Sequence, residues 1–133
     1  MANIQSISKG YKSSSNESVF KPATGKTFVA GDLVKPISSD TVDYASLVDD
    51  EDAVVYMVIE GNDTYSGKQA GRVVCLSGIF ETTVLTYQTG SYTVNAPLTA
   101  TSGKFSPKTG TKKTIAHVVS FSLSQGLKVR FSN

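Results

Sequence analysis

The strongest constraint on the fold is a series of short segments rich in β-branched and aromatic residues, each bounded by Gly, Pro, Asn or Asp. Such segments predict strands, and a spacing of roughly ten residues is typical of an antiparallel barrel or sandwich. The 14 Thr and 18 Ser residues suit strand surfaces and turns better than helices. Strands are expected over residues 28–36, 53–59, 72–76, 79–87, 93–101, 114–123 and 127–131.

Three of these segments carry more specific predictions. Phe28–Pro36 should bend at the Gly-Asp pair of residues 31–32 and end at its proline, because proline cannot donate to a sheet. Residues 53–59 form a continuous apolar run, which predicts a strand buried on both faces. Residues 124–126 are short enough for a hairpin loop between the last two strands.

The sequence contains one helix candidate, Asp40–Val48, which Ser39 or Asp40 could cap. A length of 133 residues predicts one domain that is large enough to bury a core. The predicted fold class is therefore all-β: a small antiparallel β-barrel or sandwich with an extended N-terminal arm and at most one short helix.

The first 18 residues differ in composition from the rest, since six of them are serine and few are apolar. Such a stretch cannot offset its ordering entropy alone, so we expect an extended arm over residues 1–18 and a β-barrel domain over residues 19–133. Two interpretations of the arm remain open. It is either a disordered terminus or a segment that orders on a neighbouring subunit, with Ile4, Ile7 and Tyr11 as its anchors.

Charge is segregated along the chain although the net charge is only +2. Residues 1–35 carry a net +3, residues 36–67 carry −8, and residues 68–133 carry +7. Either these segments pair within one molecule, or they form two faces of opposite sign that suit subunits packed side by side. The small net charge argues against non-specific nucleic-acid binding.

Residues with catalytic or metal-binding chemistry are sparse. A single Cys and a single His exclude an intrachain disulfide and the usual four-ligand zinc site. Asp49–Asp52 lacks the spacing of an EF-hand loop and is interpreted as a solvated loop. Cys75 and His117 are interpreted as structural residues, because no nucleophile motif surrounds them. We therefore predict no enzyme, no cofactor and no metal.

A basic loop follows near the C-terminus, with Lys104, Lys108, Lys112 and Lys113 around Phe105 as a possible stacking ring. Single-strand binders usually interleave several aromatic residues with bases, so a solvated loop is favoured here. No apolar run approaches the length of about 20 residues that a membrane span requires. The start of the chain also lacks the build of a signal peptide.

Several short strand and turn segments of the sequence follow one another in an order that resembles that of the small β-barrel head decoration, or cement, proteins of tailed bacteriophages. The resemblance covers roughly residues 28–131 and rests on residues 29–34, 54–61, 97–105, 115–120 and 127–131. It implies a non-enzymatic virion protein that binds the outer surface of the expanded head and stabilises it. It further implies the major capsid protein as partner and a homo-oligomer, with a trimer favoured.

On this interpretation the protein is expected on the virion surface, and in the host cytoplasm during assembly, with no membrane or specific nucleic acid as partner. The first candidates for capsid contact are Ile4, Ile7, Tyr11 and Phe20. The alternatives are another virion part, such as a head-completion or tail-tube protein, and a small module that binds glycan or nucleic acid.

Overall fold

A computed structural model describes residues 4–8, 14–48, 54–63 and 71–133 of the chain. Within these ranges the protein is all-β and contains no helix, which confirms the predicted fold class. The strands are β1 (Ile4–Ser8), β2 (Ser14–Pro22), β3 (Leu33–Pro36), β4 (Thr41–Tyr44), β5 (Tyr56–Glu60), β6 (Val73–Val84), β7 (Pro97–Thr101), β8 (Lys104–Pro107), β9 (Ala116–Ser122) and β10 (Gly126–Ser132).

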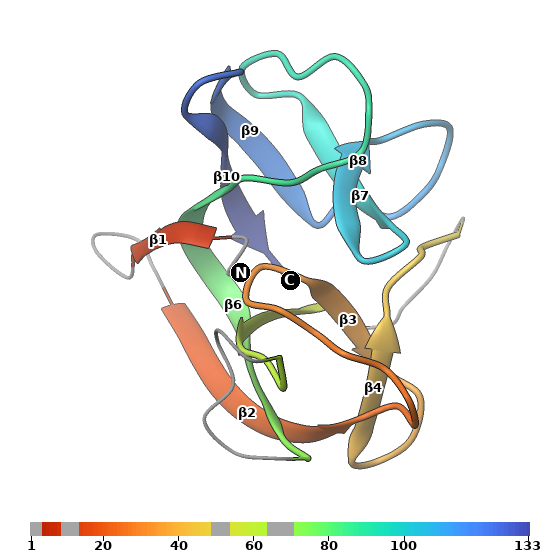
Figure 1. The fold of residues 1–133 in the computed structure, drawn as a ribbon. Coiled ribbons are helices and arrows are strands. Elements are labelled where there is room, and N and C mark those ends of the chain that lie inside the picture. Colours follow the sequence, from red (N-terminus) through yellow and green to blue (C-terminus); the bar gives the residue numbers. More distant parts are fainter. Residues whose placement is uncertain (1–3, 9–13, 49–53, 64–70) are drawn as a thin grey trace.

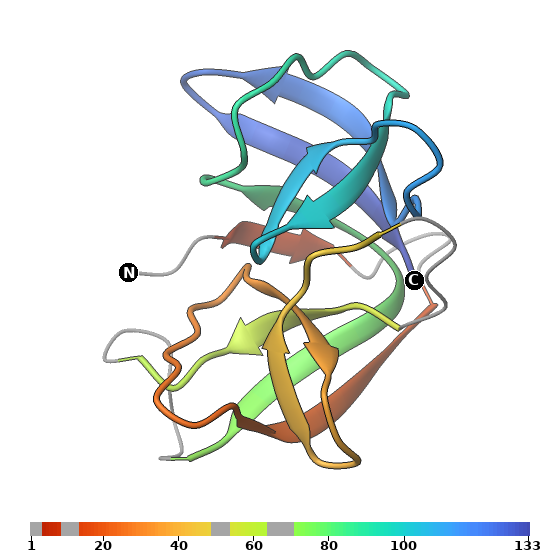
Figure 2. The ribbon, with the colours of Figure 1, turned by 90° about the vertical axis from the view of Figure 1, so that its right-hand side faces the viewer.

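The long strand β6 is shared by the two halves of the molecule (Figures 1 and 2). Its first part pairs with β5 and β2, and the order β2-β4-β3-β5-β6 returns to β2, which closes a five-stranded barrel. Its second part pairs with β10, from which the sheet continues through β9 and β7 to β8. β1 pairs with the other edge of this second part. Closure of the barrel leaves its strands without free edges.

Two apolar clusters lie on opposite faces of the sheet that β3, β5 and β6 form. One fills the five-stranded barrel, with Val34, Val58 and Cys75 among its members. The other, larger cluster lies between the barrel and the second sheet, and it includes Met57 and Phe131. Met57 and Val58 are adjacent in β5 and both fully buried, which confirms burial on both faces for the middle of the predicted segment. The strand is Tyr56–Glu60 and not residues 53–59, and Val54 before it is exposed.

The β7–β8 hairpin joins the two halves through its tip. The backbone N–H of Leu33 donates to Gly103 O, and the N–H of Gly103 donates to Ala45 O, both at 2.9 Å. Gly103 has a φ of +79°, and a Cβ at this position would lie 2.4 Å from Cδ1 of Tyr44. Only glycine can adopt this backbone conformation so close to the ring without a clash.

The prediction of a helix over Asp40–Val48 is wrong, because residues 41–44 form strand β4. Asp40 Oδ1 accepts hydrogen bonds from the hydroxyls of Ser38 and Thr41, which stabilises a turn where a helix N-cap was expected. Val42 is fully buried in the barrel, and antiparallel pairing with β3 supplies the backbone partners. The β-branched residues of this segment therefore pack in a strand.

Two segments that were expected as separate strands, 72–76 and 79–87, are joined in β6. Gly78 lies at their junction with a φ of +100°. Its backbone N–H and C=O pair with Asn133, at 2.6 Å and 3.0 Å. The glycine thus lets the strand bend as it passes from the barrel to the second sheet, while its backbone stays hydrogen-bonded.

The boundary expected between residues 18 and 19 falls inside β2. This strand pairs with β6 from Ser14↔Ile79 to Phe20↔Val73, and then with β4 at Lys21 and Pro22. Residues 14–18 thus belong to the strand that closes the barrel, so a deletion meant to leave the barrel intact must end before Ser14.

Candidate binding surfaces

The expected capsid-contact residues do not form one patch within the described part of the chain. Ile4 and Ile7 lie in β1, at the register positions opposite Val84 and Thr82 of β6. Phe20 lies opposite Val73, at the other end of the same strand. Tyr11 is outside the described residues. The structure therefore places the two described groups at opposite ends of β6.

Phe20 is half-buried and packs on its own barrel. Its ring meets that of Tyr56 edge-on, with 5.0 Å between the centroids. The preceding residue, Val19, is 59% exposed and faces the opposite way along β2. Because strand side chains alternate between faces, Val19 is better placed than Phe20 for a contact with another protein. The sequence alone did not distinguish the two residues, since both are apolar.

The outward face of the second sheet carries a row of polar side chains across β6, β10 and β9, with the charged ones on β6 and β10. Arg130 donates to Oε2 of Glu81 from Nη2 at 2.7 Å and from Nε at 3.2 Å. Lys128 Nζ lies 3.9 Å from Oε1 of the same carboxylate. His117 is exposed beside Arg130 in the register. This row presents charge to the exterior and matches the cross-strand pairing expected of opposite charges.

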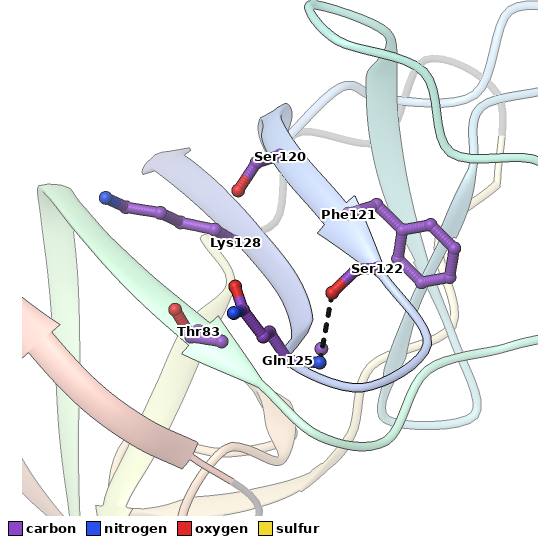
Figure 3. A pocket seen from close by; sticks show the side chains of 7 residues that line it. Thr83, Ser120, Phe121, Ser122, Gln125 and Lys128 are labelled. Atoms are coloured by element: carbon purple, nitrogen blue, oxygen red, sulfur yellow. Dashed lines mark hydrogen bonds between the residues drawn. The ribbon is translucent and has the colours of Figure 1, made fainter.

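A polar depression of about 420 Å³ adjoins this row at the end of the β9–β10 hairpin (Figure 3). The Ser122 hydroxyl there accepts a hydrogen bond from the backbone N–H of Gln125 at 3.0 Å. The ring of Phe121 points away from the depression and packs edge-on against Tyr87 at 5.3 Å. The other lining residues are Thr83, Ser120, Gly126 and Lys128. Hydroxyl, amide and ammonium groups suit hydrogen bonding to a polar partner, and no ring is available for stacking.

Two exposed leucines border the same hairpin. Leu123 lies in the turn of this hairpin and is 90% exposed, and Leu85, just beyond β6, is also exposed. A Cβ on Gly126 would lie 3.3 Å from Leu85 Cδ2, which places Leu85 beside the hairpin. Isolated surface leucines are common, and here they add an apolar margin to a polar depression.

Cys75 and His117 lie apart in the fold. Cys75 packs inside the barrel, whereas His117 is exposed on β9 of the second sheet. Burial raises the pKa of the Cys75 thiol from 9.0 to about 12, so it stays protonated at neutral pH. In the part of the chain that the structure describes, no group of three or more His, Cys, Asp or Glu residues could hold a metal ion.

The Cys75 thiol should react with an aromatic disulfide reagent at pH 8 at least about 30-fold more slowly in the folded than in the unfolded protein. Burial raises its pKa and so removes most of the thiolate, the higher nucleophilicity of the remaining thiolate offsets part of this loss, and the barrel hinders the reagent. Stopped-flow absorbance, with and without denaturant, measures both rates, and equal rates in the two states would contradict the burial of Cys75.

Above pH 9 the unfolded chain releases the proton of the Cys75 thiol, which the folded chain keeps. Stability should therefore fall with rising pH, by up to about 1.4 kcal/mol per unit.

The expected basic loop is partly a strand, and this corrects two interpretations. Lys104–Pro107 forms β8, and Lys104 Nζ lies 2.5 Å from Oδ1 of Asp32. Phe105 is almost fully buried in the larger core cluster, so it is not a stacking ring for a base. The reason is local alternation, which turns Lys104 toward the Asp32 carboxylate and Phe105 toward the core. The Asp49–Asp52 run lies outside the described residues.

Ion pairs within one molecule join the segments of opposite charge. Lys21 Nζ lies 3.5 Å from Oδ2 of Asp40, and Lys26 Nζ lies 3.8 Å from Oδ1 of Asp43. These pairs bring the basic start of the chain against the acidic segment that follows it. For Asp40 and Asp43, these pairs favour the interpretation that the segregated charges pair within one molecule.

Searches against protein-family models, curated proteins and solved structures find no match to the chain. None of the described residues belongs to a helix that could cross a membrane.

Proposed function

We propose that this protein is a structural virion component that binds the outer surface of a phage capsid and stabilises the expanded head. The proposal starts from the order of strand phrases that resembles the head decoration proteins. The observation that carries it is the N-terminal strand β1, which is added to the edge of β6 outside the closed barrel. Among the described strands the other edge of β1 has no partner, so a strand of another protein could add there, and backbone bonds would supply the affinity.

The chemistry of the described residues supports a binding role over catalysis. The buried carboxylate of Asp32 is engaged by Lys104, and the barrel thiol is protonated. The exposed groups lie instead on sheet faces and hairpin ends, as the row around Glu81 and the leucines at the β9–β10 turn illustrate. Many copies on one lattice would make a modest affinity per site sufficient.

The alternatives make different demands on the surface. A tail-tube protein would form rings or polymers alone. A nucleic-acid module would require exposed rings beside the basic residues, and the burial of Phe105 weighs against it. A glycan module would use the depression beside Lys128, which offers polar groups without a stacking ring. We therefore retain capsid binding as the proposal.

The full chain should co-sediment with expanded heads built from the major capsid protein of its phage, at a simple ratio to the capsid subunits. A variant that lacks residues 2–8 should bind at least about tenfold more weakly, because the added strand is gone while β2 still closes the barrel. Quantitative mass spectrometry of the pellets measures the ratio across a concentration series.

A matched control is Val94→Ser, which changes a 66% exposed side chain in the loop between β6 and β7 and should leave head binding unchanged. Circular dichroism confirms that both variants fold. Equal binding by the deletion variant would refute the role of β1. Failure of the full chain to bind heads would refute the proposed function, and rings in the absence of heads would favour a tail part.

A further inference from the structure

β1 and β2 lie one after the other on the same edge of β6, and both run antiparallel to it. Ser8, the last residue of β1, is opposite Glu81, and Ser14, the first residue of β2, is opposite Ile79. Only Phe80 lies between these two partners along β6. The two strands thus occupy the positions of one long strand that is interrupted at a single point.

The chain between them is longer than this point requires. An uninterrupted strand would place one residue opposite Phe80, whereas residues 9–13 provide five. The six Cα–Cα steps from Ser8 to Ser14 can span at most about 20 Å. The length of this connection therefore does not force β1 to pair with the β6 of its own chain, because an equivalent edge within that reach would serve as well.

β1 is also the less firmly held of the two strands. β2 pairs with both β6 and β4, and Phe20 anchors it on Tyr56. Among the described strands β1 pairs with β6 alone, and its register shifts between Ile4 and Ser6. A strand paired along one edge opens at a lower free energy than the barrel as a whole, so β1 can leave β6 without unfolding the domain.

We propose that the Glu81–Val84 edge of β6 is a strand-acceptor site, and that β1 of a second copy of this chain occupies it in assemblies. The occupant is a second copy because the edge already accepts this sequence in a defined register, Ile4↔Val84 and Ile7↔Thr82. In a reciprocal exchange each copy places its β1 on the β6 of the other copy. This reproduces every backbone hydrogen bond of the single chain and joins the two copies at two places. This exchange goes beyond head binding and takes place in solution without heads.

The test mixes two chains that each carry one new cysteine, S6C and T83C, at positions that are register partners. The mixture is concentrated, warmed below its unfolding transition so that β1 opens, cooled, and oxidised with oxidised glutathione. Exchange predicts a disulfide between the two chains, seen on a non-reducing gel at twice the 14.1 kDa of one chain. Peptide mass spectrometry identifies the linkage, and the native Cys75 is buried and does not compete.

Two controls define the result. S120C replaces T83C in the first, because Ser120 lies two strands away from Thr83 across β10, and it should yield at least tenfold less linked product. In the second, residues 9–13 of the S6C chain are replaced by one serine, which makes β1 and β2 continuous and should abolish the linkage to T83C. The proposal is overturned if the S6C and T83C mixture stays unlinked, whether or not a single S6C/T83C chain closes its own disulfide. It is equally overturned if the continuous-strand variant links as well as the parent.

Discussion

Replacement of Gly61 by alanine should destabilise the folded protein by about 3 kcal/mol or more, which lowers the melting temperature by roughly 10 °C. A Cβ at this position would lie 1.9 Å from the carbonyl oxygen of Phe28, far inside van der Waals contact. The oxygen belongs to the backbone and cannot rotate away. Its segment is further fixed because Phe28 N–H donates to Asn62 Oδ1 at 2.8 Å. Thermal and urea unfolding, followed by circular dichroism, measure the loss.

Gly25→Ala and Gly71→Ala are matched controls. Both glycines have a positive φ, +76° and +72°, but a Cβ at either would meet nothing within 4 Å. Alanine there incurs only the backbone cost of about 1–2 kcal/mol. If Gly61→Ala proved no more destabilising than these two, the close approach of residue 61 to Phe28 would not exist in the folded protein.

The sequence predicted those strands and turns whose own residues indicate burial, a bend or a hairpin. The apolar run around Met57 and Val58 indicated burial on both faces, and the bend at Gly31 is present with a φ of +101°. The turn between β9 and β10 also lies where the Ser-Gln-Gly segment predicted it. In each case a short stretch of residues determines the backbone, so no distant contact is needed to infer it.

Strands that depend on distant partners were not predicted. β2 begins with five residues of which three are serine, and it is ordered by backbone pairing with β6 some sixty residues later. β8 was interpreted as part of a solvated, lysine-rich loop, whereas Lys104 pairs with Asp32, 72 residues earlier, and the segment forms a strand. Tertiary context overrides composition in both cases.

The candidate binding surfaces were harder still to predict, because each gathers residues from separate strands. Thr83, Lys128 and Ser120 meet around one depression only after β6, β10 and β9 pair in register. A one-residue slip of any of these strands would turn its residue to the opposite face. The sequence contains no spacing that reveals such a site before the register is known.

Replacement of Lys104 by methionine should cost about 2–4 kcal/mol of stability, because it leaves a buried carboxylate without its counter-charge. The Asp32 side chain is only 3% exposed, and Lys104 Nζ approaches its Oδ1 to 2.5 Å. Oδ2 accepts the backbone N–H of Val29 at 2.9 Å, so the carboxylate is held in place. The pair also joins β8 of the second sheet to the bend before β3 of the barrel, so its loss weakens the contact between the two halves.

A double-mutant cycle isolates this coupling. Asp32→Asn alone leaves the ammonium group unpaired, while the combination of Asp32→Asn with Lys104→Met removes both charges and should be less destabilising than the sum of the single changes by about 1–3 kcal/mol. Lys21→Met is the control, since the Lys21–Asp40 pair is solvent-exposed and its loss should leave stability unchanged within error. The coupling should persist in 0.5 M salt, because a buried pair is weakly screened. A Lys104→Met protein as stable as the parent would mean that the Asp32 carboxylate is solvated, and that the two halves are joined by the hairpin tip and the apolar core alone.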